Sequence, residues 1–137
     1  MSSIDETTTE IERQSSKPKI LVVDDESMIR NLAKDVLEML GYGVETAPDG
    51  ATALRLYLEG KSRFGLVITD NDMPGMKGIQ LAGEIRANGN GVPIVISSGK
   101  YVGGAELLRQ AGVSDVLPKP YRISQLQACV EQHYKGR

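Results

Sequence analysis

Apolar residues along the chain form short runs that alternate with stretches of helical periodicity. The first run, Lys19–Val23, is continuous, which is typical of a strand buried on both faces of a parallel sheet. Over residues 27–40 apolar side chains instead recur every three or four positions, which predicts an amphipathic helix. We expect four residues of this stripe to face the core: Ile29, Leu32, Val36 and Leu40. The pattern therefore begins with a strand followed by a helix.

The same alternation repeats along the rest of the chain. It predicts further strands at residues 44–47, 66–69, 93–97 and 115–117, and further helices at residues 50–58, 79–87, 105–111 and 123–134. In the last helix we expect Ile123, Leu126 and Val130 to face inward. Five strands alternating with five helices imply a parallel sheet covered on both faces, because each right-handed crossover helix packs back onto the sheet. The predicted fold class is α/β, doubly wound, with the functional site at the carboxyl ends of the strands.

Length and composition are those of one compact domain: 137 residues, 40% hydrophobic and 25% charged. Residues 1–16 carry four acids, one base and few large apolar residues, so we expect a disordered acidic tail. The remaining 14 acids and 15 bases nearly balance, which argues against nucleic-acid binding through charge. The chain has neither a secretory-signal pattern nor an apolar run near the ~20 residues of a membrane span. We therefore expect one folded domain over residues 17–137, in the cytoplasm, without membrane or nucleic-acid partners.

Cysteine and histidine each occur once in the chain, as Cys129 and His133. A single cysteine forms no internal disulfide, and we expect no cysteine-based metal site either. Cys129 is therefore predicted to be a small buried hydrophobe.

Polar residues follow four of the predicted strands at their carboxyl ends. Asp24 and Asp25 come after the first strand, Asp70 after the third, Ser98 after the fourth and Lys119 after the fifth. Carboxylates that converge in one crevice repel each other, by roughly 4 kcal/mol for two charges about 4 Å apart at an effective dielectric near 20. Mg²⁺ relieves such repulsion, because it prefers a few carboxylate oxygens and usually also binds a phosphate oxygen. The sequence thus predicts a site for Mg²⁺ and a phosphoryl group.

Lys119 and Ser98 supply a point charge and a hydroxyl donor for that phosphoryl group. Carboxylates can form acyl-phosphate intermediates, and Asp70 is the carboxylate placed opposite both groups, so we expect it to be the nucleophile. Asp24 and Asp25 would then hold the metal. Ser97 competes with Ser98 for the hydroxyl role, although the strand pattern puts Ser98 at the very end.

Four stretches of the chain together resemble the receiver domain of bacterial response regulators. They are residues 20–26 (ILVVDDE), 70–75 (DNDMPG) with Gly78, 93–99 (PIVISSG) and 117–121 (LPKPY), and the resemblance spans residues 17–134. It implies a flavodoxin-like sheet with strand order 2-1-3-4-5 and a phosphoacceptor at Asp70. It further implies that Asp25 and Asp70 ligate Mg²⁺ directly, that the Asp72 backbone carbonyl is a third ligand, and that Asp24 acts through water.

The same resemblance assigns the remaining residues of the site. Ser98 would be the switch hydroxyl, Lys119 would neutralise the phosphoryl oxygens, and Pro120 would carry a cis peptide bond. Receivers often have an aromatic residue three positions before the lysine, where this chain has Val116. Output coupling through an inward-turning aromatic side chain is therefore not expected at that position, and Tyr101 is a candidate for part of the role.

Two other functional classes suit an α/β fold of this kind. A nucleotide or flavin binder of flavodoxin type needs a glycine- or hydroxyl-rich loop after the first strand, where acids at residues 24–26 would repel phosphate. A haloacid-dehalogenase-like phosphatase is suggested by Asp70 and Asp72, but its paired acids follow the nucleophile, whereas here they precede it. Turnover of a generic phosphate ester separates a phosphatase from a receiver.

The resemblance implies a signalling phosphoacceptor rather than a turnover enzyme. It would take its phosphoryl group from a sensor histidine kinase or a histidine phosphotransfer protein and lose it slowly by itself. We expect no output domain within the chain, so the output would pass to a separate, unidentified target protein. A stand-alone regulator and the receiver of a hybrid kinase both fit. One hypothesis is that Asp72 and Lys100 pair across the mouth of the site and slow hydrolysis there. The alternatives are that both side chains point into solvent, or that the Asp72 carboxylate orients the attacking water and speeds hydrolysis.

Overall fold

A computed structural model of the chain describes residues 17–60, 63–88 and 91–136. The expected acidic tail, residues 1–16, lies outside the described residues. Within them, five parallel strands form one sheet in the order β2-β1-β3-β4-β5, which confirms the predicted flavodoxin-like topology. The strands are β1 (Lys19–Val23), β2 (Val44–Ala47), β3 (Phe64–Asp70), β4 (Ile94–Ser98) and β5 (Asp115–Pro118).

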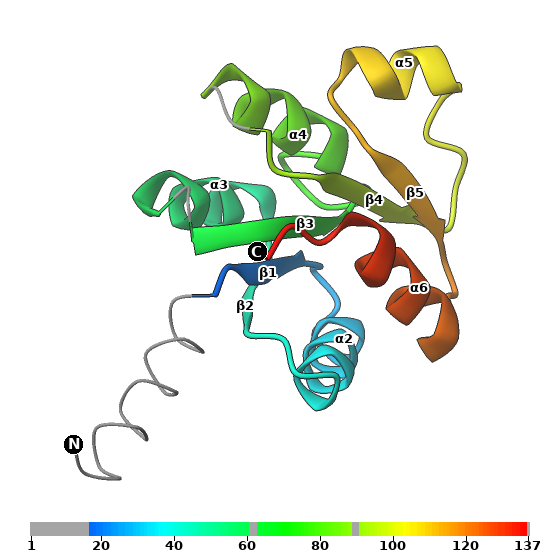
Figure 1. Cartoon of the computed structure of the whole chain (residues 1–137). Coiled ribbons are helices and arrows are strands. Elements are labelled where there is room, and N and C mark those ends of the chain that lie inside the picture. The colour runs from blue at the N-terminus through cyan, green and yellow to red at the C-terminus, as the bar shows by residue number, and fades with distance from the viewer. Residues whose placement is uncertain (1–16, 61–62, 89–90, 137) are drawn as a thin grey trace, which may run out of the picture.

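Helices cover both faces of this sheet (Figure 1). They are α2 (Ser27–Met39), α3 (Gly50–Glu59), α4 (Gly78–Ala87), α5 (Ala105–Gln110) and α6 (Ile123–His133). One face packs against α2 and α6, and the opposite face packs against α3 and α4. The short helix α5 stands beside α4, near β5 (Figure 1). No helix of the described residues is both long and apolar enough to cross a bilayer.

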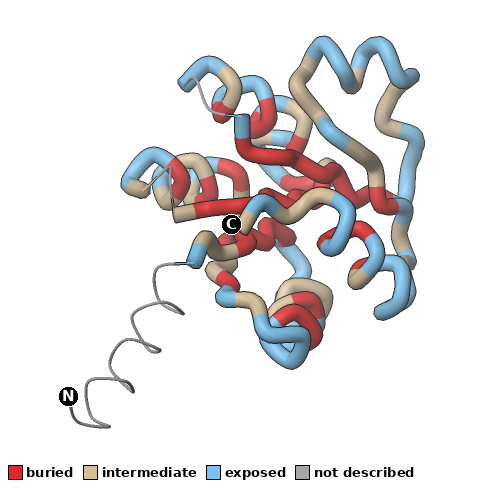
Figure 2. Tube along the Cα trace, in the orientation of Figure 1, coloured by how far each residue is buried: buried red, intermediate tan, exposed pale blue. Residues whose placement is uncertain are grey.

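The core consists of two apolar layers, one on each face of the sheet. Along β1, Ile20 and Val22 join the layer under α2 and α6, whereas Leu21 and Val23 join the layer under α3 and α4. Successive side chains of a strand point to opposite faces, so a continuous apolar run buries both. Figure 2 accordingly shows the central strands as buried and the outer sides of the helices as exposed.

Two helices bury a different set of side chains from the set that the sequence predicts. In α2 the buried stripe is Ala33, Val36 and Leu37, while Leu32 is 58% exposed and Leu40 lies beyond the helix end. The small side chain of Ala33 faces the sheet, and Leu32, about 100° around the helix, is turned to solvent. In α6, Leu126 and Val130 are buried as expected, but Ile123, the first helical residue, is 58% exposed.

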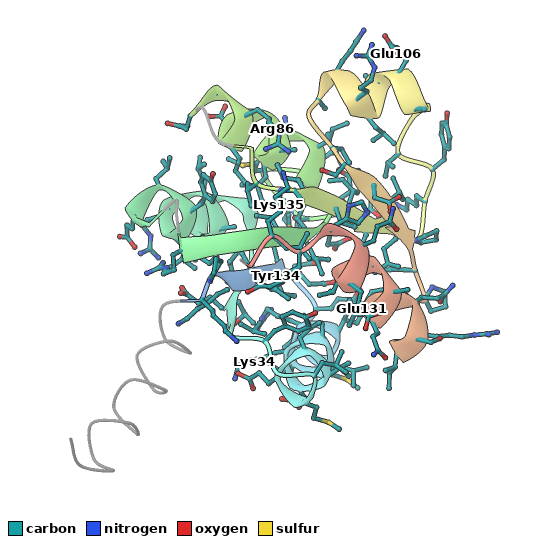
Figure 3. All side chains as sticks on the ribbon, in the orientation of Figure 1. Lys34, Arg86, Glu106, Glu131, Tyr134 and Lys135 are labelled. Atoms are coloured by element: carbon teal, nitrogen blue, oxygen red, sulfur yellow. The ribbon has the colours of Figure 1, made fainter. Side chains whose placement is uncertain are left out.

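Hydrogen bonds of three residues, Arg86, Tyr134 and Lys135, fix the periphery of the domain (Figure 3). Arg86 of α4 donates from both Nε and an Nη nitrogen to the carbonyl oxygen of Gly112, at 3.0 and 2.7 Å, and so ties α4 to the turn before β5. At the amino-terminal edge of the sheet, the Tyr134 hydroxyl donates to the Pro18 carbonyl oxygen at 2.6 Å. The N–H of Lys135 donates to Gly65 O of β3 at 3.0 Å. The segment after α6 is thereby fastened to the start of the sheet.

Candidate functional site

Three carboxylates converge at the carboxyl ends of the two central strands. Asp24 follows β1 and Asp70 ends β3, the strand paired with β1, and their exposed fractions are 4% and 3%. Asp25 is exposed, and carboxylate oxygens of all three residues lie within 4.8 Å of one another. Strand order explains the cluster, because neighbouring parallel strands end at the same edge of the sheet.

Lys119, just after β5, reaches into this cluster. Its Nζ atom lies 2.7 Å from Asp24 Oδ2 and 3.4 Å from Asp70 Oδ1, and its side chain is largely buried. Desolvation alone would lower the pKa of Lys119, but the hydrogen bond and charge of Asp24, with the charge of Asp70, outweigh it and raise the pKa. Lys119 is therefore a fixed positive charge between the two buried carboxylates.

The electrostatic environment of Asp70 differs from that of an exposed acid. Burial desolvates its carboxylate and raises its pKa above the ordinary value. A hydrogen bond from the Asp72 backbone N–H, at 3.2 Å, and the charge of Lys119 oppose this rise, while the charge of Asp24 adds to it. The charged form of Asp70 is therefore less favoured than that of an exposed aspartate, and a cation bound nearby would favour it.

Ser98, the last residue of β4, is engaged by the loop after β3. Its hydroxyl donates to Asp72 Oδ2 at 2.7 Å and accepts from the Lys100 backbone N–H at 3.1 Å. The predicted ion pair between Asp72 and Lys100 is not formed in the described part of the chain, because Asp72 binds Ser98 and the Lys100 side chain is exposed. Ser97 is also buried, and its hydroxyl has no hydrogen-bond partner among the described residues.

Close backbone contacts hold the loop between β3 and α4 in place. A Cβ atom at Gly78 would collide with the carbonyl oxygen of Asp70, so only glycine fits at the start of α4. Asn71 Oδ1 accepts the Ile79 N–H at 2.9 Å, which caps this helix from the same loop. The position of Asp70 is thus fixed by α4 as well as by its own strand.

Two features complete the geometry of the site. The Lys119–Pro120 peptide bond is cis, as expected. Arg30 of α2 donates from Nη1 to the Asp24 carbonyl oxygen at 2.7 Å, a contact that sequence analysis missed. The available signal was the position of Arg30 on the first turn of a helix that directly follows three acids, Asp24, Asp25 and Glu26.

A family model for the response regulator receiver domain matches residues 20–131. The chain belongs to this family. Transcriptional regulatory protein PrrA of Mycobacterium leprae is 36% identical to this receiver domain over 123 residues, which are 89% of the chain and 52% of PrrA. Response regulator MprA of Mycobacterium sp. (strain KMS) is 35% identical over 115 residues, 80% of the chain and 47% of MprA. The chain spans about half the length of these curated relatives.

Solved receiver domains share the fold. A response regulator receiver domain protein from Clostridium thermocellum superposes with a TM-score of 0.79 and 32% identity, covering 85% of this chain and 93% of that one. The response regulator TrrA of Thermotoga maritima, solved in complex with Mg²⁺–BeF, gives a TM-score of 0.74 and 34% identity, with coverage of 84% and 97%. This chain is therefore a signalling domain of the two-component class.

The receiver domain has no aromatic side chain at position 116, where Val116 is half-buried in β5. Tyr101, in the loop after β4, is 86% exposed. Tyr101 is three residues beyond Ser98 along the chain. It directly follows Lys100, whose backbone N–H donates to the Ser98 hydroxyl. The aromatic side chain nearest along the chain to Ser98 is thus on the surface of this receiver domain.

Proposed function

We propose that this receiver domain accepts a phosphoryl group on Asp70 in a Mg²⁺-dependent reaction and thereby changes its affinity for a partner protein. The observation that carries the proposal is the convergence of Asp24, Asp25 and Asp70, the first and last of which also contact the ammonium group of Lys119. The donor would be a sensor histidine kinase or a histidine phosphotransfer protein.

The residues of the site suit Mg²⁺. Three carboxylates within 4.8 Å of one another offer the hard oxygen ligands that Mg²⁺ prefers, and the one positive charge of Lys119 does not balance their three negative charges. We assign Asp25 and Asp70 as direct ligands with the Asp72 backbone carbonyl. Asp24 would act through water, because its two oxygens already accept from Lys119 Nζ and the Glu26 N–H. When bound, Mg²⁺ neutralises the carboxylates and polarises the phosphoryl oxygens.

Asp70 would be the nucleophile of the transfer step. One of its carboxylate oxygens attacks phosphorus, a P–O bond forms, and the P–N bond to the donor histidine breaks with its electron pair passing to the ring nitrogen. Lys119, already 3.4 Å from Asp70 Oδ1, would bind a phosphoryl oxygen through its ammonium group.

Ser98 would convert phosphorylation into a change of surface. Its hydroxyl now donates to Asp72, and a phosphoryl oxygen on Asp70 competes for that hydrogen bond. If Ser98 turns to the phosphoryl group, the hydrogen bond from the Lys100 N–H must move with it or break. The segment from Lys100 to Tyr101 would then shift, which gives a partner protein a surface that differs between the two states.

Labelling with a small phosphodonor tests this function. The chain is incubated with acetyl phosphate and Mg²⁺, and the labelled residue is mapped by mass spectrometry. We expect at most one phosphoryl group per chain, on Asp70, and none when Mg²⁺ is chelated. Asp70→Asn should abolish labelling without unfolding the domain, whereas Asp35→Asn, an exposed acid of α2, should be labelled like wild type.

Two results would count against the proposal. Stoichiometric labelling of Asp70→Asn would place the acceptor elsewhere. Continuous turnover of a generic phosphate ester would instead favour a phosphatase of the haloacid-dehalogenase type.

A further inference from the structure

A second group of metal-ligating side chains lies away from the phosphoryl site. Asp115, Cys129 and His133 each place a ligand atom within 4.8 Å of the others. Asp115 is the first residue of β5, so it lies at the opposite end of that strand from Lys119. The single cysteine and the single histidine of the chain, which the sequence presents as isolated residues, are therefore neighbours in the fold.

The local structure explains why these three side chains meet. Cys129 and His133 are four residues apart on α6, so they project from the same face of the helix one turn apart. That face packs on the sheet, where Leu126 and Val130 are buried beside them. Asp115 contacts the end of α6, and its Oδ2 lies 2.9 Å from His133 Nε2. Two ligands come from one helix and the third from the neighbouring strand.

The thiol of Cys129 is the member of this group that takes part in no hydrogen bond among the described residues, although the residue packs in the apolar core. The residue is only 7% exposed, and within the described part of the chain its sulfur makes no hydrogen bond. Burial, together with the charge of Asp115, raises the pKa of the thiol to about 11. A neutral thiol thus lies beside a carboxylate and an imidazole that already contact each other.

We propose that Asp115, Cys129 and His133 form a binding site for Zn²⁺, with the fourth coordination position open to water. The donor set of one sulfur, one nitrogen and one oxygen is suited to Zn²⁺ and is poorly suited to Mg²⁺. Tetrahedral Zn²⁺ has ligand distances of about 2.0–2.3 Å, so its ligand atoms are roughly 3–4 Å apart. The observed ligand atoms lie within 4.8 Å of one another, and Asp115 Oδ2 and His133 Nε2 at 2.9 Å are already about as close as two ligands of one ion, so small movements of the side chains would complete the site.

Binding would change the charges of the site in a defined way. Zn²⁺ displaces the thiol proton, which passes to solvent, and the thiolate and the Asp115 carboxylate then balance the two positive charges of the ion. His133 ligates as neutral imidazole. Because the ligands join α6 to β5, the ion would fasten the last helix to the edge strand of the sheet and stabilise that contact.

A plain structural interpretation competes with this proposal. The contact between His133 and Asp115 could serve only as a hydrogen bond between helix and strand, with His133 also favoured by the C-terminal end of the α6 dipole. Cys129 would then be a core residue without further function. The two interpretations differ in whether the sulfur binds a metal, which spectroscopy detects directly.

Titration with Co²⁺, a spectroscopic substitute for Zn²⁺, tests the site on the full chain. Excess Mg²⁺ is present throughout to fill the carboxylate cluster around Asp70. Thiolate bound to Co²⁺ gives a sulfur-to-metal charge-transfer band, and this chain has only one cysteine to produce it. We expect a band that saturates at one metal per chain, disappears on addition of Zn²⁺, and is accompanied by slower alkylation of Cys129.

Variants separate the ligands from their surroundings. Cys129→Ser should remove the band, and His133→Gln should weaken Co²⁺ binding by about 100-fold or more, since even loss of a supporting residue costs 10–100-fold. Glu131→Gln, on the same helix but outside the group, should bind like wild type (Figure 3). Circular dichroism of each variant checks the fold.

Three results would overturn the proposal. They are absence of a charge-transfer band from the folded wild-type chain at millimolar Co²⁺, unchanged affinity in His133→Gln, and saturation at one metal per two chains. The last result would place the thiolate in a site shared between molecules.

Discussion

Asp25→Asn should stabilise the metal-free domain while abolishing its response to Mg²⁺. Asp25 is the exposed member of the carboxylate cluster, and no ion pair of the described residues compensates it. At 4.8 Å two unit charges repel by about 1 kcal/mol in the dielectric of water and by about 3.5 kcal/mol at an effective dielectric of 20. Because Asp25 is exposed, the lower figure applies. Its repulsion from Asp24 and Asp70 together is then about 2 kcal/mol, and attraction to the Lys119 charge between them cancels about half of it, which leaves about 1 kcal/mol.

The assay is thermal unfolding, followed by circular dichroism, in chelator and in millimolar Mg²⁺ at low salt. In chelator, Asp25→Asn should raise the melting temperature by about 4 °C, at about 4 °C for each kcal/mol in a domain of this size. In Mg²⁺ the wild-type domain should gain stability by mass action, up to about 2.7 kcal/mol at one hundred times its Kd, and the variant should gain little. High salt should shrink the difference in chelator.

Asp35→Asn provides the matched control, because Asp35 is an exposed acid on α2 outside the cluster. Its stability should change by less than about 0.5 kcal/mol in either condition. If Asp25→Asn proves less stable than wild type in chelator, the electrostatic reasoning is wrong. If the variant retains the full gain from Mg²⁺, Asp25 is not a metal ligand.

Two further substitutions test the surroundings of the site, both measured by denaturant unfolding. Lys119→Ala leaves the buried carboxylates of Asp24 and Asp70 unpaired and should destabilise the metal-free domain by about 3–5 kcal/mol. Mg²⁺ should restore part of this stability. An unchanged unfolding midpoint in chelator would contradict the pairing of Lys119 with these carboxylates. Asp49→Ala removes the side chain that accepts the Thr52 N–H at 2.7 Å and should cost about 1 kcal/mol at pH 7. The hydrogen bond from Thr52 lowers the pKa of Asp49. Its contribution to stability is therefore complete above the unfolded-state pKa and disappears as the pH falls through the lower folded-state pKa. A stability difference between wild type and Asp49→Ala that persists below the folded-state pKa would refute the role of the Asp49 carboxylate as the cap of α3.

The order of the elements could be predicted from the sequence because both signals are local. An apolar run bounded by polar residues identifies a buried strand, and the strand ends then place Asp24, Asp70 and Lys119 together without any knowledge of distances. Prediction failed where packing decides between similar faces of one helix. In α2, small Ala33 faces the sheet and larger Leu32 does not, and a pattern of apolar residues alone favours the larger side chain.

Side-chain contacts between residues far apart in the sequence could not be predicted from the sequence. Ser98 and Asp72 are 26 residues apart, and their hydrogen bond depends on how the loops after β3 and β4 approach each other. The expected pairing of Asp72 with Lys100 rested on complementary charge, but an exposed ion pair contributes little and the nearer hydroxyl competes for the carboxylate. Cys129 and His133 likewise acquire a shared neighbour, Asp115, only when α6 docks on β5.

The hydrogen bond between Tyr134 and Pro18 brings the two ends of the described chain to one edge of the sheet. Asp70 lies at the other edge, and the seven residues of β3 separate the two edges by about 20 Å, at about 3.3 Å per residue. A fluorescent protein or affinity tag joined directly to Lys17 or to Gly136 would therefore begin on the far side of the domain, and an extended linker of about six residues would be needed to bring it to the phosphoryl pocket. Fusions at these two positions should leave labelling of Asp70 unhindered, which makes the domain suitable for building a reporter of its own phosphorylation.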